Sequence, residues 1–201
     1  MNGVGRRLGV MGGTFDPIHN GHLTTAEEAL TQFDLDQVVF VPTGNPWMKE
    51  HTVVSPAEHR YLMTVIATAS NPKFTVSRVE VDRAGPTYTV DTLRALQAEE
   101  PYESELFFIT GADAMLEIFH WKDPQDILEL AHFIAATRPG YDIAAFEAEA
   151  PSRNPRVSVM NVPALAISST DIRERVRDGR PIRYLVPEGV KSYVEKAGIY
   201  R

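Results

Sequence analysis

The chain has 201 residues, of which 43% are hydrophobic and 23% charged, which are ordinary values for a globular protein. Its formal net charge of −7 argues against a nucleic-acid or anionic-membrane partner, and the absence of cysteine excludes disulfides and a thiol nucleophile. The first residues contain no apolar leader and no membrane-length apolar run occurs, so we expect a soluble, cytoplasmic, single-domain protein over residues 1–201.

The first informative segment, LGVMGGTFDPIHNGH, is typical of a short strand, a glycine turn and a helix start. Gly12 and Gly13 permit a turn close to a ligand, although such a pair also occurs in ordinary strand-to-helix turns. Asn20 is the expected N-cap of a helix with His22 in its first turn and His19 just before it. Unpaired backbone N–H groups and the helix dipole favour an anion here, most readily phosphate. A metal site is the weaker interpretation, because no cysteine or carboxylate stands at ligand spacing.

The rest of the chain alternates expected strands and helices. Strands are expected at the apolar or alternating runs 37–42, 74–81, 105–110, 132–137 and 156–162. Helices are expected from the capping box Ser55-Pro56-Ala57-Glu58 to about Ala69, from Thr89 to Gln97, and from Asp123-Pro124. The buried face of the helix after Ser55 is expected to comprise Tyr61, Leu62, Val65, Ile66 and Ala69. Residues 140–154 are the expected peripheral excursion. The alternation predicts an α/β fold, a Rossmann-like doubly wound parallel sheet followed by C-terminal helices.

A second candidate phosphate site lies in ISSTDIRERVR. Hydroxyls that can cap a helix come first, at Ser168, Ser169 and Thr170. Arginines follow immediately, starting with Arg173, and arginines near a helix start oppose the helix dipole. A bound polyphosphate would remove that conflict. The alternative is a solvated surface helix in which Glu174 balances the arginines.

Together, GGTFDPIHNGH and ISSTDIR resemble the two signature elements of the nucleotidyltransferase superfamily with the HxGH motif. The resemblance implies that His19 and His22 contact the α-phosphate of a nucleoside triphosphate, and that Arg173 with its helix N-terminus holds the β- and γ-phosphates. The further ATP-binding positions that it implies in these two elements are Gly12, Gly13, Thr14, Phe15, Ser169 and Thr170.

Intervening segments resemble the nicotinate-nucleotide adenylyltransferase family of that superfamily. NPWMK is similar to the family's NPxxK element, which implies that Lys49 binds the β- and γ-phosphates. Many members have histidine where this chain has Met48, so no role is carried over for that side chain. GPTYTVDTL is similar to the family's loop at the nicotinate pocket, which implies that Thr89 lies near the nicotinate carboxylate.

GADAMLEIFHWKDP is similar to the family's GxDxxxxxxxW segment. This resemblance implies that Gly111 and Asp113 meet the AMP ribose and that Trp121 stacks on the pyridine ring. Considered alone, Trp121 is equally a core aromatic residue, Asp113 a helix N-terminal charge and Lys49 a solvated loop lysine.

The resemblance implies transfer of AMP from ATP to nicotinate mononucleotide in NAD biosynthesis, with release of pyrophosphate and with Mg²⁺ arriving on the ATP phosphates. The acceptor phosphate is already anionic, so we expect positioning and charge stabilisation rather than a catalytic base. Backbone N–H groups are expected to bind the nicotinate carboxylate, because Gly85 to Thr89 and Trp121 include no lysine or arginine. The alternatives are a sibling enzyme, such as pantetheine-phosphate adenylyltransferase or a cytidylyltransferase, and a non-catalytic nucleotide-binding regulatory protein.

Overall fold

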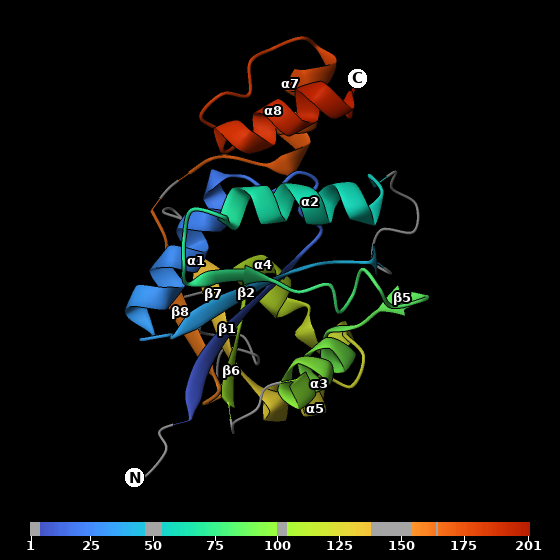
Figure 1. Cartoon of the computed structure of the whole chain (residues 1–201). Coiled ribbons are helices and arrows are strands. Elements are labelled where there is room, and N and C mark those ends of the chain that lie inside the picture. The colour runs from blue at the N-terminus through green and yellow to red at the C-terminus, as the bar shows by residue number, and fades with distance from the viewer. Residues whose placement is uncertain (1–4, 47–53, 100–103, 138–153, 164) are drawn as a thin grey trace.

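The computed structural model describes residues 5–46, 54–99, 104–137, 154–163 and 165–201 (Figure 1). Its centre is a six-stranded sheet in the order β4-β2-β1-β6-β7-β8, and every neighbouring pair is parallel. These strands are β1 Arg6–Gly13, β2 Gln37–Pro42, β4 Phe74–Val76, β6 Ser104–Gly111, β7 Ala131–Thr137 and β8 Val157–Asn161. Counted along the chain, this is the 3-2-1-4-5-6 order of a Rossmann sheet, so the predicted fold class is confirmed. A separate parallel pair is formed by β3 Asn45–Pro46 and β5 Pro86–Thr87.

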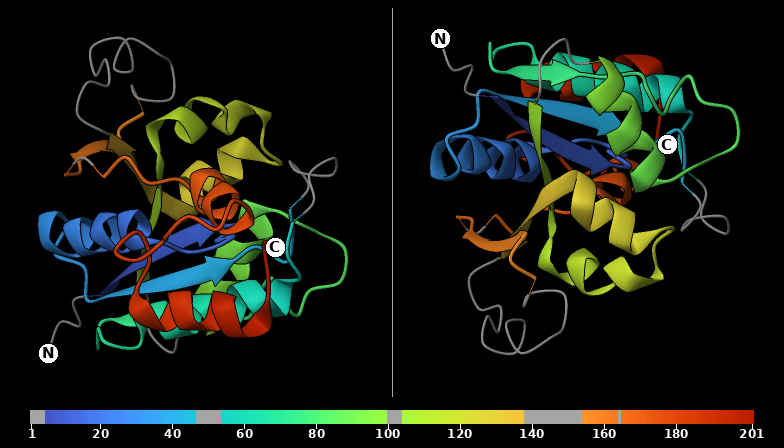
Figure 2. Two further views of the ribbon diagram at one scale, coloured as in Figure 1. Left: turned by 90° about the horizontal axis from the view of Figure 1, so that it is seen from above. Right: turned by 90° about the horizontal axis from the view of Figure 1, so that it is seen from below.

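Helices cover both faces of the sheet. One face carries α1 Asn20–Gln32, α2 Ala57–Thr68, α7 Ser169–Arg177 and α8 Glu188–Ala197. The other carries α3 Thr89–Glu99, α4 Ala112–Leu116, the 3₁₀ helix η2 Ile118–His120 and α5 Pro124–Leu130. Figure 1 shows α2, α7 and α8 above the sheet and α3 and α5 below it, and both views of Figure 2 show α8 beside α2. Alternate side chains of β2 enter the two cores, as its continuous apolar run predicts.

The expected helix starts are only partly confirmed. Asp123 precedes α5 and Pro124 is its first residue, as predicted. In α1 the N-cap is His19, and Asn20, which we expected as the cap, is the first helical residue. The prediction of a capping box at the start of α2 was wrong. Pro56 is the N-cap, and the Ser55 N–H donates to the Asp16 carboxylate at 3.1 Å.

The buried face of α2 is the reverse of the predicted one. Its buried residues are Arg60, Met63, Thr64, Ala67 and Thr68. The large apolar side chains expected inside are exposed, with relative accessibilities of 42% for Leu62, 37% for Val65 and 36% for Ile66. Arg60 is buried because its guanidinium donates to three backbone oxygens, those of Ser55, Thr14 and Gly44, at 2.8, 2.8 and 2.9 Å.

Two strand boundaries also differ from the expectation. Gly12 and Gly13 are the last residues of β1 rather than a turn after it. β4 ends at Val76, and the Ser77 N–H makes the last ladder bond of this strand, to the Phe40 oxygen of β2 at 2.9 Å. The chain turns directly afterwards, where the Asp82 N–H donates to the Arg78 oxygen at 2.9 Å, so the alternating run to Val81 does not continue as a strand. Nearly all of the expected excursion at 140–154 lies outside the described residues. In the part that is described, no helix is long and apolar enough to cross a membrane.

Candidate active site

Two cavities meet at the carboxyl ends of β1 and β6, the neighbouring strands at which the strand order reverses. Gly12 of β1 and Thr110 of β6 line both of them. The histidine cavity, of about 370 Å³, adds His19, His22 and the start of α7. The tryptophan cavity, of about 280 Å³, adds Trp121 and the start of α3. Ligands of open α/β sheets bind at this switch point, so the two cavities form one candidate site with two compartments.

In the histidine cavity, the two histidine rings stack with centroids 3.7 Å apart and planes inclined by 24°. The His19 N–H donates to His22 Nδ1 at 3.2 Å, so neutral His22 carries its proton on Nε2. The Phe15 ring meets His22 edge-on at 5.1 Å and fixes its orientation from the protein side. A Cβ on Gly21 would lie 3.0 Å from the His19 ring, so the glycine between the histidines permits this packing. The cluster is an arrangement of N–H donors suited to a phosphate.

The start of α7 is bonded directly to the loop before the histidines. Ser168 is the N-cap and accepts from the Asp171 N–H at 3.1 Å, and Ser169 Oγ donates to the Pro17 oxygen at 2.9 Å. Arg173 donates to the Asp16 backbone oxygen at 2.7 Å and to Thr170 Oγ1 at 3.2 Å. These bonds bring the two predicted phosphate elements together, although they are far apart in the sequence.

The arginines of α7 oppose the helix dipole less than the sequence predicted. Arg175 and Arg177 lie in the last turn of the nine-residue helix α7, where the dipole favours cations, so only Arg173 precedes that turn. Arg175 also pairs with Asp171 at 2.7 Å. The conflict with the dipole is therefore smaller than expected, and what marks Arg173 is its bond to the histidine loop.

The tryptophan cavity is lined by Thr89 and Trp121, the two residues assigned to the acceptor, and by the glycine loop at Gly13 and Thr14. The Trp121 ring packs edge-on against Phe108 at 6.1 Å. Its Nε1 is buried, and no hydrogen-bond acceptor lies within reach of it among the described residues. The wall thus offers an aromatic face and a hydroxyl to a ligand.

Two charged residues that sequence reasoning missed line the same cavity. Glu80 is 8% exposed and accepts from Thr92 Oγ1 at 2.6 Å. Burial raises the pKa of the Glu80 carboxyl, while hydrogen bonds from Thr92 and Thr87 oppose the rise. Lys122 holds Asp91 at 3.1 Å and lies 4.8 Å from the centre of the Tyr88 ring. Lys122 thus places a cationic side chain at this pocket, although Gly85 to Thr89 and Trp121 contain none. That backbone N–H groups bind the carboxylate stays a prediction.

The signals for these two residues in the sequence were weak. Glu80 occupies a polar position in an alternating run, which predicts a solvent-facing strand residue, but the chain has left the sheet before it. Lys122 directly follows Trp121, and this adjacency was the sequence feature that could have indicated that Lys122 lies at the pocket.

The remaining predicted site residues lie at or beyond the rim. Gly111 lines the histidine cavity, whereas Asp113 is exposed and lines neither cavity. Phe15 is buried behind His22. Thr170 lies in the first turn of α7 and accepts from Arg173. Lys49 and Met48 lie outside the described residues.

Comparison with known proteins places this geometry in a family. The family model described as cytidylyltransferase-like matches residues 10–175, a span that holds both phosphate elements and both cavities. The chain belongs to the cytidylyltransferase-like family. Within it, the chain is 62% identical over 195 residues to the probable nicotinate-nucleotide adenylyltransferase of Leifsonia xyli subsp. xyli, covering 97% of this chain and 94% of that protein. It is 60% identical to the same-named protein of Saccharopolyspora erythraea, covering 98% and 90%.

Solved structures agree on the fold. The chain superposes on the Plasmodium falciparum nicotinic acid mononucleotide adenylyltransferase complexed with NaAD with a TM-score of 0.78, at 19% identity and over 97% of each chain. The relatives confirm the resemblance to nicotinate-nucleotide adenylyltransferases, and the structural match supports the Rossmann-like architecture.

Proposed function

We propose that the chain transfers AMP from ATP to nicotinate mononucleotide and releases nicotinate adenine dinucleotide and pyrophosphate. The observation that carries the proposal is the meeting of the two cavities at Gly12 and Thr110. One cavity holds the stacked histidines and the other holds Thr89 and Trp121. A nucleotide phosphate and an acceptor phosphate can therefore approach each other across the shared wall. The curated relatives carry the name of this activity.

The chemistry proposed for the histidine cavity is charge stabilisation. An oxygen of the acceptor phosphate attacks the α-phosphorus of ATP, the new P–O bond forms, and the bond to the β-phosphate oxygen breaks. No proton need be removed, because the attacking phosphate is already ionised. His22 Nε2–H and His19 are assigned to the oxygens of the α-phosphate, with backbone groups from Gly12 to Phe15. Donors placed where charge develops stabilise the transition state more than the ground state.

The leaving pyrophosphate is assigned to the start of α7, with Ser169, Thr170 and Arg173, and to Lys49. The bonds of Arg173 to the Asp16 backbone oxygen and to Thr170 Oγ1 hold its guanidinium beside the first turn of α7. We assign Gly111 and Asp113 to the AMP ribose.

The acceptor is assigned to the tryptophan cavity. Trp121 would stack on the pyridine ring, and Thr89 with nearby backbone N–H groups would bind its carboxylate. Lys122, held near the cavity by Asp91, adds a positive charge that favours an acid over an amide.

Mg²⁺ is proposed to reach the site on the ATP phosphates and to neutralise part of their charge. Mg²⁺ usually keeps several waters and binds through substrate phosphates. Across residues that the structure describes, no group of three or more His, Asp or Glu side chains is arranged to hold a metal ion.

The test is a pyrophosphate-release assay on purified chain with Mg²⁺, across ATP and CTP and three acceptors: nicotinate mononucleotide, nicotinamide mononucleotide and phosphopantetheine. We expect release with ATP and nicotinate mononucleotide, and nicotinate adenine dinucleotide by mass spectrometry. Turnover only with phosphopantetheine, or with CTP, would favour a sibling enzyme instead. If a folded chain that binds ATP releases no pyrophosphate with any of the three acceptors, the result would support the regulatory alternative.

A further inference from the structure

Asp16 links the histidine loop to three distant segments. Its side chain is 4% exposed, and both carboxylate oxygens accept hydrogen bonds. Oδ1 accepts from Tyr200 Oη at 2.5 Å, and Oδ2 accepts from the Ser55 N–H at 3.1 Å. The backbone oxygen of the same residue accepts from Arg173 at 2.7 Å. Asp16 thus fixes the position of the loop three residues before His19.

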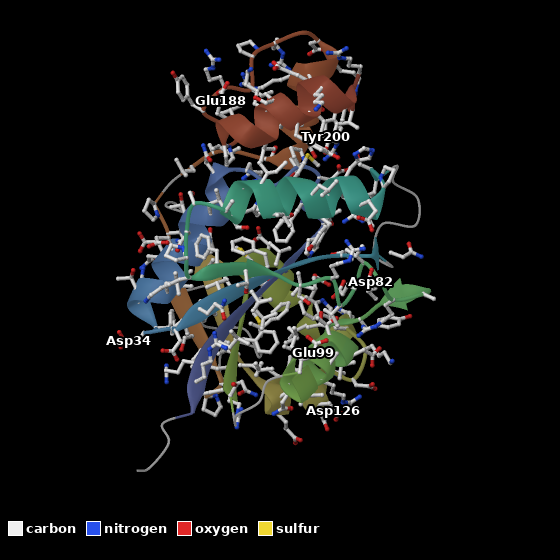
Figure 3. All side chains as sticks on the ribbon, in the orientation of Figure 1. Asp34, Asp82, Glu99, Asp126, Glu188 and Tyr200 are labelled. Carbon is white, nitrogen blue, oxygen red and sulfur yellow. The ribbon has the colours of Figure 1, made fainter. Side chains whose placement is uncertain are left out.

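Tyr200 reaches this buried carboxylate from the segment after α8. Gly198 ends α8 in the left-handed conformation, and Tyr200 itself has φ 71°, a region that a tyrosine rarely adopts. The bent backbone directs the phenol inward, and its ring packs against the core beneath α1 and α2. Figure 3 shows Tyr200 between α8 and α2, on the face of the sheet that carries the histidine helix. Burial and the neighbouring Asp16 raise the pKa of the Tyr200 hydroxyl, so it stays protonated and donates.

We propose that Tyr200 is a positioning residue for nucleotidyl transfer, because its hydroxyl holds Asp16 and thereby sets the loop that presents His19 and His22. The inference rests on the proposed function. The hydroxyl does not touch a substrate; it acts through Asp16. A hydrogen bond to a buried carboxylate is among the stronger ones in proteins, so its loss leaves Asp16 to reorganise. Displacement of reacting groups by about 1 Å can slow a reaction by roughly a hundredfold.

The test compares two variants that each delete one tyrosine hydroxyl from the same part of the chain. Tyr200→Phe keeps the ring and removes the bond to Asp16. Tyr193→Phe is the matched control, because Tyr193 Oη contacts His59 Nδ1 at 2.8 Å and joins α8 to α2 away from the histidine loop. We expect Tyr200→Phe to lower kcat roughly tenfold to a hundredfold, with the KM for the acceptor changed by less than about twofold. Tyr193→Phe is expected to leave kcat unchanged, even if both variants melt at lower temperature.

A double variant tests whether the hydroxyl acts through Asp16. In an Asp16→Asn background, Tyr200→Phe is expected to cause little further loss of kcat, since the partner has already been altered. Additive losses would overturn the inference. So would a folded Tyr200→Phe variant with kcat within about twofold of the parent chain, or equal losses in Tyr200→Phe and Tyr193→Phe.

A readout without turnover separates this inference from the proposed function. The imidazole signals of His19 and His22, followed by nuclear magnetic resonance in ligand-free chain, are expected to shift in Tyr200→Phe and not in Tyr193→Phe. If the parent chain turns over no acceptor but these signals shift as described, the proposed function fails and the positioning bond stands. Unchanged signals in Tyr200→Phe would refute the positioning bond, whatever the activity.

Discussion

Arg60 is expected to contribute more to stability than any arginine in a surface ion pair. It is 1% exposed, and its guanidinium donates to the backbone oxygens of Thr14, Gly44 and Ser55. Each bond from a charged donor is worth about 1.5–3 kcal/mol, so deleting all three removes roughly 5–9 kcal/mol. Relief from burying the guanidinium, whose pKa burial lowers, offsets several kcal/mol. We therefore expect Arg60→Met to reduce the free energy of unfolding by about 3–5 kcal/mol.

Urea unfolding followed by circular dichroism measures this change, provided that the m-value is unchanged. Arg60→Lys is expected to lose nearly as much, because one ammonium group cannot span three oxygens. Arg94→Met is the control, because Arg94 forms an ion pair with Asp126 in which both side chains are half-exposed. Loss of this pair is expected to lower the free energy of unfolding by less than about 1 kcal/mol. If Arg60→Met and Arg94→Met destabilise the chain equally, the three bonds do not hold the loops as described.

Four residues that line the two cavities give further predictions. His22→Ala should lower kcat by about 10²–10³-fold, a loss of 2.7–4 kcal/mol, with near-normal acceptor KM in steady-state assays; a near-normal kcat would contradict its role. Trp121→Ala should weaken the binding of nicotinate mononucleotide and of nicotinamide mononucleotide by a similar amount, about 1–3 kcal/mol, because stacking does not distinguish the acid from the amide. Lys122→Met should lower kcat/KM for nicotinate mononucleotide more than for nicotinamide mononucleotide. The folded chain favours the neutral carboxyl of Glu80, because burial raises its pKa above the 4.5 of the unfolded chain. The parent chain should therefore lose stability relative to Glu80→Gln as pH rises above 4.5. Urea unfolding at several pH values checks the last, and a pH-independent difference would refute it.

Elements that a short local sequence pattern specifies were predicted correctly. The continuous apolar run of β2 has the predicted bounds, 37–42, and Asp123-Pro124 starts α5 as the cap-and-proline rule requires. The alternation of such strands with helices was sufficient for the fold class, because a parallel sheet needs crossover helices.

The orientation of α2 could not be predicted, because hydrophobic periodicity ignores hydrogen bonding. Thr64 and Thr68 are buried without penalty since each hydroxyl donates to a backbone oxygen one turn earlier, at 2.8 and 2.9 Å. Arg60 is drawn inward by three loop oxygens that come from distant parts of the chain. With these polar groups inside, Leu62 and Ile66 face outward.

The candidate site was predicted where one short motif carries it and missed where tertiary structure assembles it. His19 and His22 are near neighbours in sequence, and their places at the N-cap and in the first turn of α1 bring their rings together. Glu80, by contrast, reaches the tryptophan cavity only through the turn after β4 and the contact with Thr92 of α3. No local pattern encodes that meeting.

The central position of β1 has a consequence for how the chain folds. Arg7 bonds Asp36, the residue before β2, across a separation of 29 residues, and Glu105 of β6 across 98 residues. Pairing over the longer separation closes a larger loop and is the slower event in folding. Both cavities use Gly12 from β1 and Thr110 from β6, so neither exists until that pairing is made. During refolding, nucleotide binding should therefore recover with the final, slowest phase, after helical structure has returned.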